Sequence, residues 1–240
     1  MSETERAQVV ATLPSDFPVS ESNPPEGDRH FEAYTNARET LERWYRERGK
    51  SVYISGNLPV YYPGERMFSP DVIAVLDVEP HARDSWIVSR EGHGLDFALE
   101  VIVSGRRRKD LRDNVQRYAT LGIKEYFVFD RSRMTLHAYR LTVDGAYARL
   151  MPQSGRYASN VLGLDLSLDG DKLRFSIGDS PLLYHGELIN KLGALVNDAE
   201  QRANELEVAL EEEQKLREVA EAEVQALRAE LEKLRRERLP

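Results

Sequence analysis

The chain of 240 residues contains no cysteine, which excludes disulfide bonds and thiolate metal sites. It also lacks any run of about eighteen apolar residues, so the sequence predicts no membrane-spanning helix. Its first residues have neither a basic start nor a long apolar segment, which argues against a signal peptide. These absences together predict a soluble, cytoplasmic protein.

Several catalytic signatures are missing as well. There is no GxGxxG motif, no complete phosphate-cradling GxxxxGK[ST] loop and no GxSxG motif, so nucleotide hydrolases and α/β-hydrolases have no support. The five histidines show no paired spacing of the kind that binds metal. A formal net charge of −8 argues against tight non-specific binding to nucleic acid, although it is compatible with a local basic cleft.

Composition divides the chain into three parts. Residues 1–28 are rich in Ser, Pro and Glu, which predicts a flexible N-terminal arm. Residues 29–180 have the mixed patterns of one globular domain. Residues 187–238 consist mainly of helix formers. From Glu187 onward the chain has fourteen acidic and nine basic side chains, which account for five of the eight net negative charges.

Hydrophobic periodicity predicts the elements of the domain. Helices are expected over 30–48 and 110–121. Strands are expected over 96–103 and 125–130, within 51–62, 68–78 and 162–177, and as a hairpin-like pair within 134–150. Residues 79–95 are interpreted as an irregular connection. The strand–helix–strand unit that spans 96–130 implies a right-handed parallel crossover.

The tail has a 4,3 alternation that is typical of a coiled coil. Eleven of its thirteen seam positions are apolar, and Glu213 and Arg217 form a polar break. The pattern predicts a homodimer; a single amphipathic helix that folds back on the body is the alternative. The seam consists of Leu192, Val196, Ala199, Ala203, Leu206, Leu210, Glu213, Arg217, Ala220, Val224, Leu227, Leu231 and Leu234.

Two acids stand inside or beside apolar strands. Asp71 follows Pro70 at the start of one strand, and Glu100 lies in the middle of another, DFALEVIV. A carboxylate in a core strand is costly unless it is paired or bound to a cation. Two such acids on neighbouring strands would form an oxygen site for Mg²⁺ or Mn²⁺ rather than zinc. The alternative is that each acid lies at a strand edge, facing solvent or an arginine.

A basic cluster, GRRRK, follows the second strand. Arg106, Arg107, Arg108 and Lys109 are candidate contacts to a DNA backbone, which would make the affinity fall with salt. A solvated helix entrance is the alternative. Bases at the start of a helix oppose its dipole, so stabilisation alone explains the cluster poorly.

Three segments occur in a fixed order: Pro70-Asp71, LEV around Glu100, and KDLRDNVQRYATLGIKEYFVFD. Together they resemble the Uma2 family of restriction-endonuclease-like proteins, in the PD-(D/E)xK nuclease superfamily. The resemblance extends from His30 to Ile177. It implies a mixed sheet flanked by helices, a divalent cation held by Asp71 and Glu100, and a backbone carbonyl from the strand after Glu100. The implied reaction is hydrolysis of a DNA phosphodiester.

One position departs from the superfamily pattern. Its usual lysine, two residues after the second acid, is Ile102 here, and the migrated lysine of Uma2-like chains corresponds to Asn114. Lys109, Arg107 and Arg117 are the candidate substitutes. At about 100° per residue, Lys109 would lie about 140° from Asn114 if the helix already includes it. Lys109 remains the chemical favourite because it is the only lysine of the cluster.

These observations predict a metal-dependent endonuclease in which Asp71 and Glu100 hold the cation and Lys109 balances charge. The neutral Asn114 favours an alternative, a catalytically reduced member of the fold that binds DNA or protein. In a third interpretation the coiled coil recruits a partner and the domain is a scaffold.

Overall fold

A computed structural model of the protein describes residues 2–14, 27–103 and 107–237, the last four of these by their backbone alone. The chain forms two compact units that divide between His185 and Gly186. In the described part of the chain, no helix is long and apolar enough to cross a membrane.

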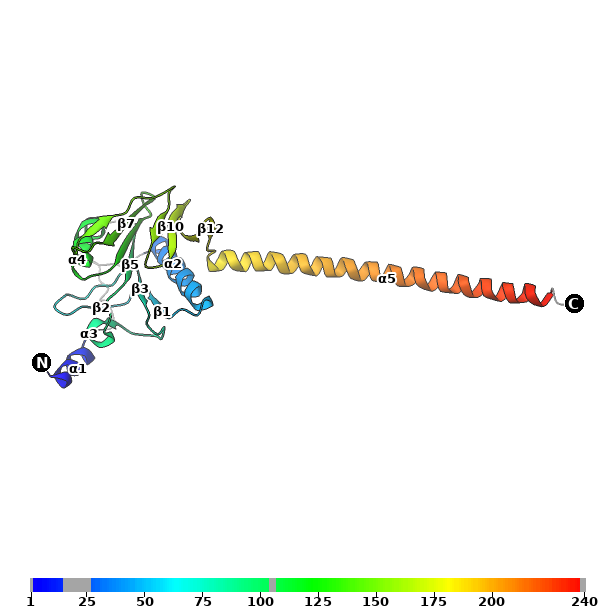
Figure 1. Ribbon diagram of the computed structural model, residues 1–240, viewed down its shortest axis with the longest axis horizontal. Coiled ribbons are helices and arrows are strands. Elements are labelled where there is room, and N and C mark those ends of the chain that lie inside the picture. The colour runs from blue at the N-terminus through cyan, green and yellow to red at the C-terminus, as the bar shows by residue number, and fades with distance from the viewer. Residues whose placement is uncertain (1, 15–26, 104–106, 238–240) are drawn as a thin grey trace. The chain divides into compact units, whose positions relative to one another are not determined.

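The body is built on a six-stranded mixed sheet of order β1-β3-β5-β6-β7-β8 (Figure 1). β5 and β6 are parallel, whereas every other neighbouring pair is antiparallel. The parallel crossover and the hairpin-like pair predicted from the sequence are therefore confirmed. The strands are β1 (Val52–Ser55), β3 (Val72–Leu76), β5 (Phe97–Ile102), β6 (Glu125–Asp130), β7 (Thr135–Leu141) and β8 (Tyr147–Arg149).

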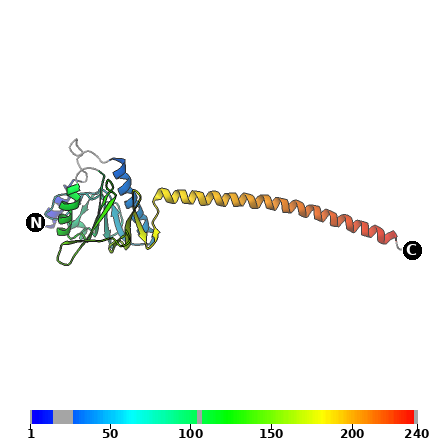
Figure 2. The same ribbon diagram turned by 90° about the horizontal axis from the view of Figure 1, so that it is seen from above.

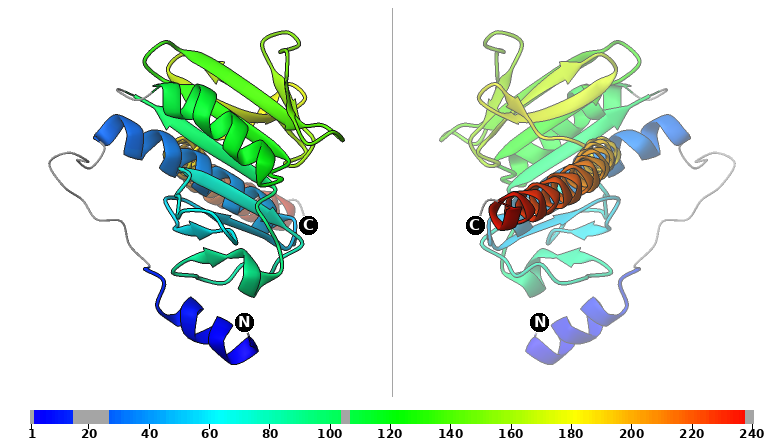
Figure 3. Two further views of the ribbon diagram at one scale, coloured as in Figure 1. Left: turned by 90° about the vertical axis from the view of Figure 1, so that its left-hand side faces the viewer. Right: turned by 90° about the vertical axis from the view of Figure 1, so that its right-hand side faces the viewer.

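Helices cover both faces of this sheet (Figure 3). α2 (Asp28–Glu47) packs Ala37 and Leu41 against one face, where Phe97 and Leu99 of β5 point. α4 (Asn114–Thr120) packs on the other face, together with Ala98 of β5. Side chains alternate between the faces of a strand, so the wholly buried FALEVI segment supplies both cores. In the first turn of α2, Phe31 is 59% exposed, whereas the neighbouring His30 is buried.

Two smaller sheets complete the body. The first has the order β12-β11-β10-β9, and its leucines and Phe175 join the core on the α2 side. The second is the parallel pair β2 and β4. The predicted irregular connection over 79–95 is wrong in part, because it contains β4 and the short α3. Trp86 there is fully buried and stacks on Tyr53. The elements are β2 (Val60–Tyr61), β4 (Trp86–Ile87), α3 (Val88–Glu91), β9 (Tyr157–Ser159), β10 (Leu164–Asp169), β11 (Lys172–Ile177) and β12 (Ser180–Pro181).

The N-terminal segment contains a helix, α1 (Glu3–Ala11), which has no buried residue; the flexible arm stays a prediction. The cause of the helix is a capping box: Glu5 N donates to Ser2 Oγ at 3.3 Å, and Ser2 N donates to Glu5 Oε2 at 2.6 Å. Overall composition hides this local signal. Residues 15–26 of the predicted arm lie outside the described residues.

The C-terminal unit is a single helix, α5 (His185–Glu237), of 53 residues (Figure 2). The predicted helical tail is thus confirmed. Its association into a coiled coil is not tested by one chain and stays a prediction.

Candidate active site

Asp71 and Glu100 lie close together where β3 and β5 pair. Val72 lies opposite Leu99, so Asp71, just before β3, and Glu100, just after Leu99, are at the same end of this pairing. The negative charge of Asp71 acts on the Glu100 carboxyl. Both acids are buried, with 6% and 4% of their surface exposed. The two acids are therefore neighbours, and their role as metal ligands stays a prediction.

Asp71 is fixed through one of its two oxygens. Val101 N donates to Asp71 Oδ2 at 2.6 Å, and Nε2 of His30 lies 2.9 Å from the same oxygen. His30 comes from the first turn of α2 and is 3% exposed. The backbone beside the acid is held closely as well, since a Cβ added to Gly56 would lie only 2.9 Å from the carbonyl oxygen of Asp71.

Glu100 is likewise held through one oxygen. Tyr118 donates its hydroxyl to Glu100 Oε1 at 2.9 Å, and Asn114 Nδ2 donates to the same atom at 3.3 Å. Burial raises the pKa of Glu100 well above its usual range, and the nearby Asp71 raises it further. The positive charge of Lys109 offsets part of that rise.

The remaining carboxylate oxygens suit a hard divalent cation. Within the described residues, Asp71 Oδ1 and Glu100 Oε2 accept no hydrogen bond, and neither is among the fully buried polar atoms. Across residues 2–14, 27–103 and 107–237, no three His, Asp or Glu side chains gather as a metal-binding group. Mg²⁺ is commonly held by one or two carboxylates and keeps several waters, so this pair fits it.

The helix that follows β5 begins with an irregular turn. Lys109–Asp113 is a π-helical segment, and Asn114 N donates to the carbonyl of Lys109, five residues back. Such a turn takes in more residues than an α-helical turn, so the 100° rule used to place Lys109 is wrong here. The wider turn brings Lys109 and Asn114 toward the same side of the helix.

Lys109 lies beside Asp110, and the neighbouring acidic side chains favour its protonated form. Its Nζ is 3.3 Å from Asp110 Oδ1, and 52% of its side chain is exposed. Partial burial would lower the pKa of Lys109, but the negative charges of Glu100 and Asp110 raise it overall. The side chain therefore stays cationic at the edge of the site.

The two arginines that were candidate substitutes have partners elsewhere. Arg107 Nε donates to Asp130 Oδ2 at 2.7 Å, and its Nη2 donates to the same oxygen. Arg117 Nη2 lies 3.1 Å from Glu65 Oε1, and its guanidinium covers the ring of Phe68. Of the three candidates, Lys109 alone lies beside the acid pair.

The basic cluster is only partly exposed. Arg108 is exposed and makes no polar contact within the described residues, whereas Arg107 is engaged by Asp130. Arg106 lies outside the described residues. Arg112 is a further exposed base, on the π-helical segment. It lies outside the run of four consecutive bases, so the sequence pattern did not single it out.

Two other contributors were missed. His30 stands 41 residues before Asp71, and no spacing rule links them. Asp110 is 8% exposed and accepts from Asn114 Nδ2 at 3.0 Å. Its position four residues before Asn114 on a predicted helix was the only available signal. Ile102, at the usual lysine position, is buried in the core on the Glu100 side of the sheet.

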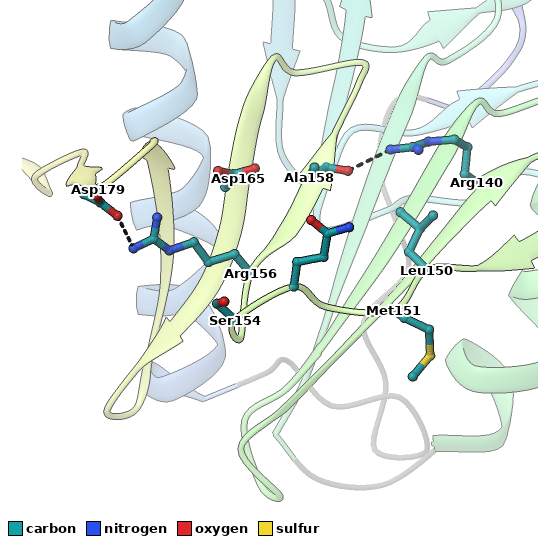
Figure 4. Close-up of a pocket in the computed structure, with 9 residues that line it drawn as sticks. Arg140, Leu150, Met151, Ser154, Arg156, Ala158, Asp165 and Asp179 are labelled. Carbon is teal, nitrogen blue, oxygen red and sulfur yellow. Dashed lines mark hydrogen bonds and ion pairs between the residues drawn. The ribbon is translucent and has the colours of Figure 1, made fainter.

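A separate cavity of about 530 Å³ is lined by none of these residues (Figure 4). Its two arginines are paired: Arg156 with Asp179 at 2.8 Å, and Arg140 as a donor to the carbonyl of Ala158 at 2.7 Å. It is therefore not a rival to the acid pair. The lining consists of Arg140, Leu150, Met151, Gln153, Ser154, Arg156, Ala158, Asp165 and Asp179.

Known proteins resemble this chain to different degrees. No curated protein matches the chain significantly. One similar solved structure is the crystal structure of "a putative nuclease belonging to DUF820" from Anabaena variabilis ATCC 29413; the identity is 11%, the TM-score is 0.47, and the match covers 61% of this chain and 87% of that one. The model of the Uma2 family, described as "Putative restriction endonuclease", matches residues 20–169, which include Asp71, Glu100 and Asn114. The chain therefore belongs to the Uma2 family.

Proposed function

We propose that the protein is an Mg²⁺- or Mn²⁺-dependent endonuclease that hydrolyses DNA phosphodiester bonds. Membership in a family described as a restriction endonuclease supports a nuclease-like function. The observation that carries the proposal is the acid pair. Asp71 and Glu100 lie close together at one end of the β3–β5 pairing, and each has one oxygen that accepts no hydrogen bond within the described residues.

The protein's own groups orient these ligands. His30 and the Val101 amide hold one oxygen of Asp71, so the other points away from them. Tyr118 and Asn114 do the same for Glu100. Partners of this kind fix the direction of metal-binding carboxylates and tune their affinity.

A divalent cation at this pair would polarise the scissile phosphate and lower the pKa of the attacking water. Lys109 supplies the second positive charge. Its ammonium is half-exposed, lies beside Asp110 and is kept protonated by the surrounding acids. It would balance the charge of the bound phosphate, the role that Asn114 cannot fill because an amide is neutral.

The same end of the helix supplies contacts to the DNA backbone. Arg108 and Lys109 are exposed, and Arg106 and Arg107 precede them in sequence. Of these, Arg107 is engaged by Asp130 and would contribute least. Phosphate contacts of this kind make binding weaken as salt rises. A homodimer formed through α5 is part of the proposal, because a long helix with an apolar seam is otherwise left uncovered.

A second candidate function is DNA binding without cleavage. The specific observation in its favour is Asn114, which donates to both Glu100 and Asp110 and occupies the position where the family resemblance implies a lysine. A site without that charge would still bind a cation and DNA while cleaving slowly or not at all.

Supercoiled plasmid and Mn²⁺ test the two functions, with the near-isosteric variants Asp71→Asn and Glu100→Gln. Glu125→Gln is the matched control, since Glu125 is another buried strand carboxylate, bound instead by Arg140 and Asn160 N. The proposal expects nicking by the wild type and the control, and none by the two site variants. Absence of both nicking and calorimetric Mn²⁺ binding in the wild type would overturn it. Cation and DNA binding without nicking would establish the second candidate.

A further inference from the structure

Helix α5 carries a long, exposed apolar seam. Eight large apolar side chains lie along it at positions of one 4,3 repeat, each 47–71% exposed. Such spacing places them on one stripe of a helix. Ala199, Ala203 and Ala220 continue the same stripe. The large members are Ile189, Leu192, Val196, Leu206, Leu210, Val224, Leu227 and Leu231.

The seam has a charged centre. Glu213 and Arg217 occupy consecutive seam positions between Leu210 and Ala220. Arg217 Nε also pairs with Glu221 Oε1 at 3.0 Å along the helix, and both side chains are more than 60% exposed. Any helix that covers this seam must therefore accommodate one acid and one base at adjacent layers.

A parallel, in-register pair accommodates them badly. Each seam residue then meets its own copy, so Glu213 faces Glu213 and Arg217 faces Arg217. The three alanines also meet alanines, which leaves thin layers. Like charges at a covered interface and underfilled layers both weaken association.

An antiparallel pair that crosses at Lys215 accommodates the layers from Val196 to Leu234. Glu213 then faces Arg217 of the second copy, and Arg217 faces Glu213 of that copy. Both charged layers are therefore attractive. Each alanine meets a leucine: the pairs are Ala220 with Leu210, Ala203 with Leu227, and Ala199 with Leu231, while Leu206 faces Val224. Facing large and small residues fill a helix interface evenly.

Charges on the flanks of the seam do not decide the direction. In the antiparallel pair Glu200 lies near Arg228 and Arg202 near Glu230, but Glu207 lies near Glu221. In the parallel pair Arg202 lies near Glu207 and Glu223 near Arg228. Exposed pairs of this kind contribute little, so the covered layers dominate.

We infer that α5 binds a second copy of itself in an antiparallel arrangement centred on Lys215. This extends the proposed homodimer and does not depend on whether the domain cleaves DNA. Thirty residues separate His185, where α5 begins, from the crossing point. At 1.5 Å per residue, the two helix starts lie about 90 Å apart. The two chains therefore enter the helix pair at opposite ends, and one dimer does not bring its two acid pairs to the same end.

Cysteine cross-linking of the full chain tests the arrangement, because the natural sequence has no cysteine. Ala203→Cys and Leu227→Cys chains, one of them tagged, are treated with a short thiol cross-linker separately and mixed. The inference expects covalent dimers that contain one chain of each kind. Gln214→Cys, next to the crossing point, should also cross-link to itself. Val208→Cys, on the outer side of the helix, is the control and should not.

Covalent dimers from Leu227→Cys alone would show a parallel pair and overturn the inference, as would a monomer by light scattering of the wild type. Charge reversal gives an independent readout. Glu213→Arg should weaken the dimer at least tenfold, and adding Arg217→Glu to it should restore the dimer. In a parallel pair the single reversal only exchanges one like-charged layer for another. None of these readouts changes if the nicking assay fails.

Discussion

Asn114 Nδ2 lies 3.3 Å from Glu100 Oε1, at the position where the family resemblance implies a lysine. The amide also donates to Asp110 at 3.0 Å. It thus reproduces the hydrogen bonds of an ammonium group without its charge. Asn114 is therefore close enough to Glu100 to hold the place of a charged group, but its amide is neutral.

Asn114→Lys should increase the rate of plasmid nicking at least about tenfold, because a fixed positive charge near a developing phosphate charge stabilises the transition state. The ammonium would also lower the raised pKa of Glu100. The rate is measured with saturating Mn²⁺. Asn114→Leu is the control, since it removes the donor without adding charge. A gain of equal size in the leucine variant would show that charge is not the cause.

His30→Ala should weaken Mn²⁺ binding by about 10–100-fold, the usual effect of removing a group that orients a metal ligand. Asp71 would keep the Val101 amide but lose its side-chain partner. Calorimetry measures the affinity, and thermal unfolding reports whether the variant is folded. Phe31→Ala is the control, because Phe31 is the next residue of α2 and is exposed. Unchanged affinity in a folded His30→Ala variant would remove His30 from the site.

The strands and the acid pair could be predicted because their signals are local. FALEVI is apolar apart from one acid, and Pro70-Asp71 marks the start of a strand, so both carboxylates are conspicuous in the sequence. The parallel crossover follows from the length of the segment between β5 and β6. The closeness of the two acids depends on the β3–β5 register, which two short strands leave undetermined without the rest of the sheet.

The partners of the acids could not be predicted, because they depend on tertiary contacts. His30 reaches Asp71 from a helix 41 residues away. The π-helical segment changes the direction of Lys109, and helical periodicity assumes its absence. Arg107 pairs with Asp130 across 23 residues, which removes from the basic cluster a charge that the sequence alone counts as available.

Glu100→Gln should stabilise the metal-free protein by about 1 kcal/mol at neutral pH. Burial and Asp71 raise the pKa of Glu100, so its folded state favours the protonated form. For a carboxyl with a raised pKa, stability falls as the pH rises from the unfolded value of about 4.3 through the folded value. Glutamine removes this loss, and its Oε1 still accepts from Tyr118.

Thermal unfolding of the wild type and of Glu100→Gln, with and without Mn²⁺, checks this prediction. The metal should stabilise the wild type, because it binds only the folded state, and should leave Glu100→Gln unchanged. Equal stabilisation of both proteins by Mn²⁺ would place the cation elsewhere.

Asp130→Asn should lower the free energy of unfolding at pH 7 by about 3 kcal/mol, because it breaks a buried charge pair. Asp130 is 1% exposed, and its carboxylate accepts from Arg107, from Ser132 Oγ at 2.9 Å and from Arg133 N at 3.2 Å. Burial alone would raise its pKa, but the hydrogen bonds from Arg107 and Ser132 lower it overall. The carboxylate form is therefore favoured in the folded state.

The sign of the pH dependence follows from that lowered pKa. The stabilisation is present above the unfolded pKa of about 3.9 and is lost as the pH falls through the lower folded value. The wild type and Asp130→Asn should therefore converge in stability below about pH 4, as measured by urea unfolding from pH 7 to pH 3. The control Asp84→Asn, at an exposed acid, should track the wild type throughout. A constant gap for Asp130→Asn across this range would mean that the charge of Asp130 contributes nothing and that only its packing and neutral hydrogen bonds do.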